Sequence, residues 1–508
     1  ETDRDGAFGI LPEQADLSID RSELAQAGPW RAGAGATTPQ ASFNQGNQID
    51  FVHDYGAEVG GPIVKDRLWV WGSYGKQKIQ LRTIADVVDF TDLEAKNAKI
   101  NAQIASNNSA SGFYFDSDKV KIGRNAGPTR PQETTFDQGK FGPKPTTYKV
   151  EDTHIFSSNF YLTGMYSKVN GGFELAPEGG LGIDATAGVD GVWHNSFYLY
   201  QTERPQDNFK ADASSFFNTG SLSHELKFGA GFREAEVSSL TNWAGEGYVL
   251  DSLAFYGFGG FSVLNADRPG NAKQNIKYTS VYAQDTMTVG NLTFNAGIRW
   301  DKQEGTQLAS SSPANAEWGL PAVSHGERDA GFDWTNISPR LGLTYALGAE
   351  RKTLLRASYA RFADQLGSGT VNWTDPLRAP GYTYWITTQP TGAGNDGNVT
   401  AGEVVAPFGI SANVDPRNGG LLNSNGVDSD FSAPISDELL FGVEHALLPE
   451  FVVGLNLTYR KISDIIEGEW LVFDGDTTQC QADGDPLACP AFTGSNLNSL
   501  GRVHQRSD

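Results

Sequence analysis

Cysteine is almost absent from this chain, which has only Cys480 and Cys489 among its 508 residues. Two cysteines are too few for a disulfide-stabilised scaffold, and they lack the spacing of a zinc site. They enclose the polar segment CQADGDPLAC, so a disulfide that closes a small loop is expected, with two unrelated thiols as the alternative. A disulfide would place this segment in an oxidising compartment.

Long apolar runs and an excess of basic residues are also missing. No stretch approaches the ~18 consecutive apolar residues that a transmembrane helix needs. The chain carries 61 acidic and 39 basic side chains, a net charge of −22, whereas a nucleic-acid partner requires a basic surface. A transmembrane helix is therefore excluded, and the acidity argues against a nucleic-acid partner. A transmembrane β-barrel is not excluded, because its strands show only alternating hydrophobicity.

Catalytic signatures are missing too. The sequence contains no G-x-S-x-G, H-E-x-x-H, P-loop or C-x-x-C motif. The histidines are scattered and form no pair at the spacing of metal ligands on one face of a helix. We therefore expect a protein that is not an enzyme and that has no cofactor.

One segment partly matches a calcium-binding loop. In GAGNDGNVTAGE (392–403), Asp396, Asn398 and Glu403 occupy positions 5, 7 and 12 of that template. Glycine occupies the first and third ligand positions, however, and a calcium ion needs six to eight oxygen ligands. The expectation is a degenerate loop without metal, and calcium binding is the alternative.

What the sequence does contain is a period-2 alternation of apolar and polar residues. In LTFNAGIRW (292–300), Leu, Phe, Ala, Ile and Trp alternate with Thr, Asn, Gly and Arg, and FVVGLNLTYR (451–460) repeats the pattern. The apolar face of such a strand can pack on a second sheet in a soluble sandwich or contact lipid in a membrane barrel. Alternation within one strand does not separate these two folds.

The lengths of the connections do separate them. The pattern predicts about fourteen strands. They span roughly 54–63, 68–81, 95–105, 111–121, 147–156, 160–174, 195–217, 223–240, 277–289, 292–304, 337–347, 353–364, 437–448 and 451–467. Short turns alternate with long polar loops, near 82–94, 122–146, 175–194, 241–276, 305–336, 365–436 and from 468 onward. Because this places every tight turn at one end of the strands, we predict an all-β fold: a transmembrane antiparallel barrel with short periplasmic turns and long extracellular loops. One strand, 195–217, contains Pro205 as a predicted bulge.

Five ordered blocks resemble Oar-like TonB-dependent outer-membrane receptors. The blocks are DYGAEVGGPIVKDRLWVWGSYGK (54–76), AGPTRPQETTF (126–136), NISPRLGLTYAL (336–347), KTLLRASYARFADQLG (352–367) and DELLFGVEHALLPEFVVGLNLTYRKISDII (437–466). Arg340 and Arg460 lie on the polar phase of their strands, where they are expected to pair with carboxylates inside the barrel.

The resemblance implies a transporter of the bacterial outer membrane with a barrel of about twenty-two strands, of which this chain would supply about fourteen. It also implies an N-terminal plug that contacts the TonB–ExbB–ExbD complex, and contact with outer-membrane lipid and lipopolysaccharide. Residues 1–50 do not resemble a plug and are expected to be a loop or linker. Residues 51–508 are expected to form the barrel, incomplete at the C-terminus because GRVHQRSD resembles a loop.

Ligand recognition is expected in the longest loop, where Trp373, Tyr382, Tyr384 and Trp385 lie close together in the sequence. Exposed aromatic rings suit sugars or peptides, and the alternative is that they pack the loop on itself. The transported ligand is not defined: small molecules, peptides and proteins all remain open. The alternative function is a passive outer-membrane pore or a surface adhesin.

Overall fold

The structure is a computed structural model that describes part of the chain. It covers residues 47–83, 85–139, 142–187, 191–196, 198–245, 247–252, 262–378, 381–388, 403–411, 421, 425–428, 430–472 and 499–506. The calcium-like residues Asp396 and Asn398 lie outside the described residues, as do both cysteines and residues 1–46.

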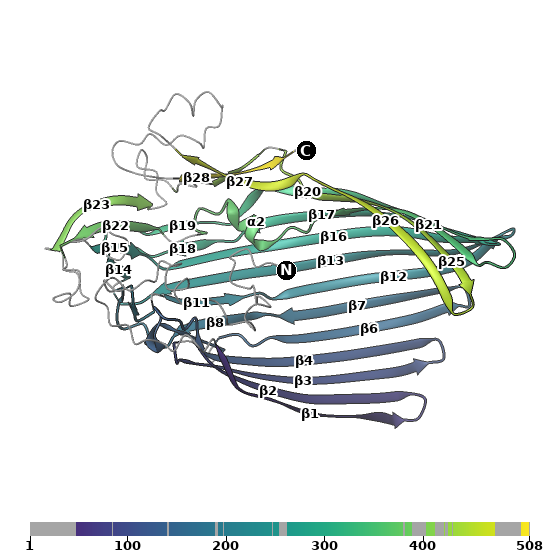
Figure 1. Ribbon diagram of the computed structural model, residues 1–508, viewed down its shortest axis with the longest axis horizontal. Helices are drawn as coiled ribbons and strands as arrows, with labels where there is room; N and C mark the ends of the chain where they lie inside the picture. Colours follow the sequence, from purple (N-terminus) through teal and green to yellow (C-terminus); the bar gives the residue numbers. More distant parts are fainter. Residues whose placement is uncertain are drawn as a thin grey trace.

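Most of the described chain belongs to one large antiparallel sheet (Figure 1). This sheet has seventeen strands, of which β5 (Phe136–Gln138), β8 (Gly172–Pro177) and β11 (Tyr198–Glu203) are short pieces beside longer strands. The other fourteen are β1 (Gln48–Val64), β2 (Leu68–Arg82), β3 (Val88–Ala105), β4 (Asn108–Arg124), β6 (Thr146–Ser157), β7 (Phe160–Asn170), β12 (Gln206–Thr219), β13 (Leu222–Trp243), β16 (Gly270–Val289), β17 (Leu292–Gln307), β20 (Arg328–Leu347), β21 (Thr353–Ala363), β25 (Ile435–Leu448) and β26 (Phe451–Ser463). Each pairs with the next in chain order, so the sheet is a meander.

The predicted strands are confirmed, and so is the predicted alternation of short and long connections, with one exception. Two of the tight turns begin at Gly220 and Gly290, whose φ angles of 64° and 59° are easy only for glycine. The tight turns lie at one end of the sheet, here called the turn end, and the long connections lie at the other, called the loop end (Figure 1).

One predicted long loop is wrong. Residues 83–87 alone connect β2 to β3, whereas a loop over 82–94 was expected. Lys76 lies 3.4 Å from Asp92 and 3.2 Å from Glu94, so oppositely charged side chains pair across these two strands. Charged residues thus continue the strands beyond their apolar part, where alternation of hydrophobicity gives no signal.

Pro205 interrupts a strand without shifting its register. β11 and β12 lie in one line against β13, because Glu203 pairs with Ser238 and Gln206 pairs with Ala235. Keeping 195–217 as one strand position is therefore confirmed. The predicted bulge is wrong, because the same number of residues, two, lies between the two pairs on each strand. Because proline has no backbone N–H, one hydrogen bond of the ladder is missing at Pro205, while the alignment of the strands is kept.

The predicted C-terminal loop is also wrong in part. Ser499–Arg506 forms β28, which pairs with β27 (Ile465–Val472) and, in parallel, with β24 (Asn425–Val427). Other small elements at the loop end are β9 (Ala185–Ala187), β10 (Trp193–His194), β14 (Tyr248–Ser252), β15 (Ser262–Asp267), β18 (Ser310–Ser312), β19 (Val323–His325), β22 (Tyr382–Thr387), β23 (Val404–Ser411) and the helix α2 (Ser368–Trp373). In the described part of the chain, no helix has the length and apolarity that crossing a membrane requires.

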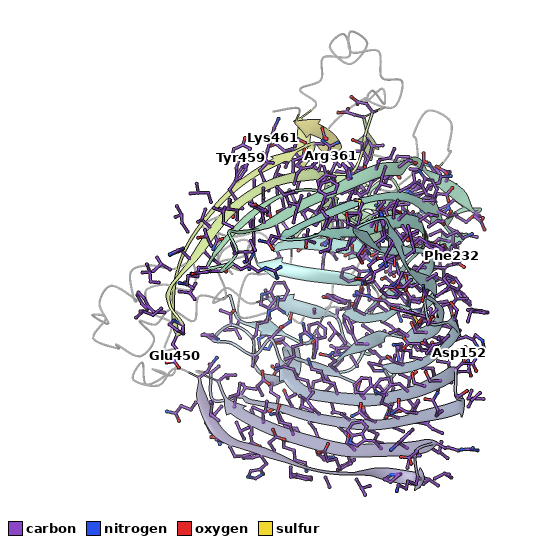
Figure 2. The ribbon with its side chains drawn as sticks, turned by 90° about the vertical axis from the view of Figure 1, so that its right-hand side faces the viewer. Asp152, Phe232, Arg361, Glu450, Tyr459 and Lys461 are labelled. Atoms are coloured by element: carbon purple, nitrogen blue, oxygen red, sulfur yellow. The ribbon has the colours of Figure 1, made fainter. Side chains whose placement is uncertain are left out.

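The sheet curves into an arc, and alternation divides its side chains between a convex and a concave face. Phe232 and Tyr459 lie on the convex side (Figure 2). The registers place Ile298 and Leu341 on that same face, and Leu455 and Leu457 on β26 share it with Tyr459. Large apolar side chains are exposed along this face. The concave face carries the intervening polar residues.

Candidate functional site

A row of tyrosines marks the limit of the apolar band on the convex face, on the side of the loop end. Four hydroxyl groups each donate a hydrogen bond to a carboxylate. The pairs are Tyr74 to Glu94 at 3.3 Å, Tyr114 to Asp116 at 3.1 Å, Tyr166 to Asp207 at 2.6 Å and Tyr359 to Asp437 at 2.6 Å. In the aromatic belt of a membrane barrel, each ring lies at the edge of the lipid and its hydroxyl group reaches the polar layer. These four tyrosines have this arrangement. The apolar band below the belt is therefore the lipid-contacting surface.

The concave face is hydrophilic and contains paired charges. Arg460 on β26 lies 2.6 Å from Glu438 on β25, which confirms the expected pairing of this arginine with a neighbouring strand. Arg340 instead stacks over the ring of Phe362 at 4.9 Å. These residues face the interior that the curved sheet surrounds.

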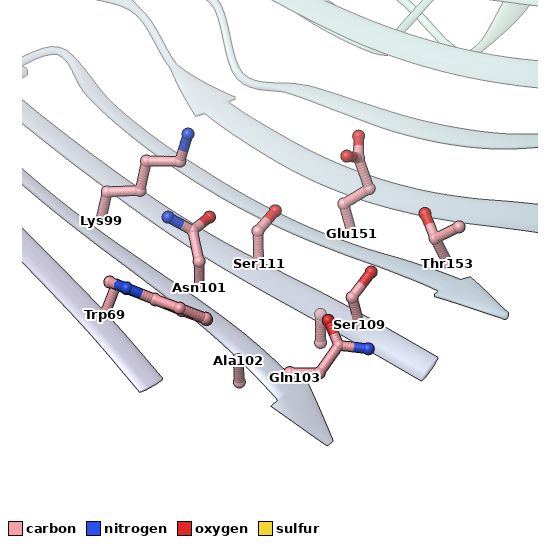
Figure 3. Close-up of a pocket in the computed structure, with 10 residues that line it drawn as sticks. Trp69, Lys99, Asn101, Ala102, Gln103, Ser109, Ser111, Glu151 and Thr153 are labelled. Atoms are coloured by element: carbon pink, nitrogen blue, oxygen red, sulfur yellow. The ribbon is translucent and has the colours of Figure 1, made fainter. Parts of the chain in front are cut away.

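Near the turn end, the concave face holds a polar cavity of about 300 Å³ (Figure 3). It is lined by Trp69, Lys99, Asn101, Ala102, Gln103, Ser109, Ala110, Ser111, Glu151 and Thr153. Lys99 and Glu151 supply one charge of each sign, and the remaining polar groups are amides and hydroxyls (Figure 3). This surface offers hydrogen bonds to water or to a polar chain, without a surplus of charge.

At the loop end, residues 364–378 fold onto the concave face and are here called the inward segment. Gln303 holds its start: its Nε2 donates to the carbonyl of Asp364 at 3.0 Å, and its Oε1 accepts from the Leu366 N–H at 2.7 Å. Gln307 donates to the carbonyl of Val371 at 3.0 Å and to the hydroxyl of Thr374 at 2.7 Å. Two glutamines of β17 thus bind the backbone of this segment.

Apolar packing supports the same contact. Leu366 and Val371 are buried together with Trp334 of β20, Ile276 of β16 and Phe431. Sequence reasoning missed both glutamines: the predicted strand ended at 304, before Gln307, and Gln303 within it was given no role. Their signal was available: Gln303 and Gln307 continue the polar phase of Arg299 in DKQEGTQ.

Asp375 of the inward segment contacts a histidine of β19. The Nε2 of His325 lies 3.2 Å from Asp375 Oδ1, and its Nδ1 lies 2.8 Å from the carbonyl of Gly326. This contact joins the fully buried Asp375 to β19.

The four aromatic residues predicted to bind ligand occur in two different places. Trp373 ends α2, donates to the carbonyl of Gly426 at 3.0 Å, and packs against the cluster around Leu366. Arg378 stacks over its ring at 4.4 Å, and burial lowers the pKa of Arg378.

Trp385 belongs to a second cluster with Trp318 and Leu264, while Tyr382 and Tyr384 lie on the same strand, β22. The structure thus separates Trp373 from the other three residues. Of the calcium-like residues, only Glu403 is described, and its carbonyl accepts from the Thr388 N–H at 2.7 Å. The described residues contain no group of three or more potential metal ligands.

The fold and its two faces define a membrane-spanning β-barrel protein, and comparison with known proteins gives its family. Residues 88–459, well over half of the chain, match the family described as "Outer membrane beta barrel domain". The chain belongs to this family and is a protein of the bacterial outer membrane. Short turns of such barrels lie in the periplasm, so the turn end is periplasmic and the loop end is extracellular.

Solved structures of similar fold are outer-membrane transporters and receptors. The outer membrane transporter YddB from Escherichia coli superimposes with a TM-score of 0.58 at 12% identity, covering 92% of this chain and 52% of YddB. The siderophore receptor PirA from Acinetobacter baumannii gives a TM-score of 0.51 at 12% identity, covering 91% of this chain and 57% of PirA. The chain spans little more than half the length of either protein. A comparison with curated proteins finds no significant match.

Proposed function

We propose that this chain is the barrel part of an Oar-like TonB-dependent receptor that takes up a ligand across the outer membrane. In this proposal it catalyses no bond change. An N-terminal plug closes the barrel, and the TonB–ExbB–ExbD complex supplies the energy that moves the plug. The finer assignment to Oar-like receptors rests on the five sequence blocks, since similarity at 12% identity supports only the fold.

The observation that carries this proposal is the open, polar concave face of a wide sheet. In the described part of the chain, β1 pairs only with β2, and β26 pairs only with β25. All but one residue of each edge strand are exposed. A sheet in lipid must satisfy its edge N–H and C=O groups, so we infer that further strands close the barrel. A barrel wider than fourteen strands has room for a plug.

Electrical conductance tests this proposal against the passive pore. The full-length protein is inserted in planar lipid bilayers, and its conductance is compared with that of a variant lacking everything before residue 47. We expect a closed full-length protein and a large, steady conductance for the shortened variant, because the plug blocks the lumen. High conductance of the full-length protein would instead identify a passive pore.

Energy coupling is tested in cells. Uptake of a bound ligand should require an intact TonB system, whereas binding at the cell surface should not. Surface binding without any uptake in either strain would favour the adhesin.

The same cells test the predicted disulfide, since Cys480 and Cys489 should resist thiol labelling until a reductant is added.

Ligand contacts at the loop end belong to the same proposal. We assign them to Trp373, Tyr382, Tyr384 and Trp385, as the sequence suggested. Because Trp385 packs against Trp318, its removal would also disturb the fold of the loop end. The variant Tyr382→Ala/Tyr384→Ala is therefore the test for a selective loss of ligand binding, and Thr383→Ala on the same strand is its control.

A further inference from the structure

A second cavity lies higher on the concave face, in the wall formed by β7, β12, β13, β16 and β17. Its volume is about 220 Å³. Arg233 faces it, while the adjacent Phe232 lies on the convex face (Figure 2). On the convex face of β13, Glu234 follows Phe232 and pairs with Lys277 of β16, so the apolar band ends there on the side of the loop end. The cavity lies at the same level on the concave face.

One glycine of β13, Gly231, lines this cavity. An added Cβ at Gly231 would lie 3.1 Å from the hydroxyl of Ser280 on β16, which is tighter than an ordinary contact. A larger side chain at this position would extend into the cavity, so glycine keeps this part of the wall open.

Positive charge is in excess around the cavity. Lys210, Arg233 and Arg299 line it. Lys210 lies 2.7 Å from Asp212, and Arg299 lies 2.7 Å from Asp301. These two carboxylates are further occupied, because Tyr282 donates to Asp212 at 2.6 Å and Tyr278 donates to Asp301 at 2.5 Å. Three cations thus share two carboxylates.

Arg233 is the cation left over. Its guanidinium lies 5.2 Å from the centre of the Tyr278 ring, and its Nε is buried without a hydrogen-bond partner. Within the described part of the chain it forms no ion pair. A guanidinium binds carboxylate and phosphate oxygens through two parallel N–H donors, and a buried N–H group without a partner is costly.

We propose that this cavity is a binding site for one carboxylate or phosphate group, which Arg233 binds and Lys210 attracts. One such anion balances the surplus charge. The inference rests on the proposed function, because it gives the interior wall a place where an anionic group is held during passage. The group can belong to a diffusible ligand or to a side chain of the same protein seated in the lumen.

Titration calorimetry of the full-length protein in detergent tests this site, with citrate and inorganic phosphate as probes at low salt. We expect wild-type protein to bind at least one probe, and Arg233→Gln to weaken that binding at least tenfold. Arg233→Lys keeps the charge but loses the paired donors, so it should bind with intermediate affinity. The matched control is Arg460→Gln, which removes a concave-face arginine that already has Glu438 as a partner.

A second measurement distinguishes the two sources of the anion. If a carboxylate of the same protein fills the site, wild-type protein binds neither probe, and Arg233→Gln lowers the thermal midpoint by several degrees more than Arg460→Gln does. Equal effects of the two variants in both assays would overturn the proposal. Failure of TonB-dependent uptake would end the proposed function and leave these binding results unchanged, so the two failures are distinguishable.

Discussion

The lipid-contacting part of the sheet, here called the wall, and the loop end are stabilised in different ways. On the wall, Leu455 and Leu457 are 62% and 61% exposed, because lipid surrounds them. At the loop end, Leu264 and Leu366 are 0% and 1% exposed and belong to compact clusters. The wall is held by its ladder of backbone hydrogen bonds, which lipid cannot replace. The loop end stands in water and needs a hydrophobic core of its own.

This difference matters for function. The wall can present a polar concave face along its length because its apolar residues need no partner inside the protein. The loop end instead uses its apolar residues to fix the inward segment over the lumen. The two regions should therefore respond in opposite ways to the same kind of substitution.

The largest effect is expected from Trp334→Ala. Removing this buried ring should destabilise the contact between β20 and the inward segment by about 3–5 kcal/mol, the usual range for truncating a large core residue. Limited proteolysis should then cut between residues 364 and 378, while heat-modifiable migration of the barrel stays intact. The control Leu457→Ala should leave both readouts unchanged, since lipid replaces the lost contacts. Cutting in both variants alike would contradict a core confined to the loop end.

A charge on the wall should act in the reverse manner. Leu455→Arg places a cation against lipid and should cost about 2–4 kcal/mol if it lies near the midplane. Asn456→Arg, one residue further on the concave face, should cost little because the lumen is hydrated. The free energy of unfolding in lipid vesicles, measured with urea, checks both variants. Equal losses for the two would mean that the assignment of faces on β26 is wrong.

The smallest effect concerns pH and is expected only at the loop end. Burial raises the pKa of Asp267 to about 8, and its Oδ2 has no hydrogen-bond partner. The unfolded form releases this proton near pH 4 and the folded form near pH 8, so stability falls as pH rises between these values. We expect this loss of stability to be seen as faster proteolysis of the loop end at pH 8.5 than at pH 5.5.

Asp267→Asn is the control for that prediction. Asparagine keeps the shape and has no proton to lose, so proteolysis of the loop end should become independent of pH over this range. Resistance of the barrel wall to proteolysis should not change with pH in either protein. A pH dependence that persists in Asp267→Asn would assign the effect to another group.

The sequence by itself determined the wall. In a strand, successive side chains point to opposite faces, so the alternation at 292–300 and 451–460 was sufficient to locate the strands and to divide their residues between lipid and lumen. The alternation of short and long connections then gave the barrel, because it fixes which end of each strand carries a turn. No tertiary contact was needed for these predictions.

Only the tertiary structure decided the loop end and the sites. Beyond the lipid both faces of a strand are polar, so the charged start of β3 and the strand β28 gave no periodic signal. Gln303 and Gln307 bind backbone groups more than sixty residues away. Lys210 and Arg299 pair with Asp212 and Asp301, and among the described residues no ion pair includes Arg233. Such relations depend on which strands become neighbours and on the register between them, and periodicity within a single strand contains neither.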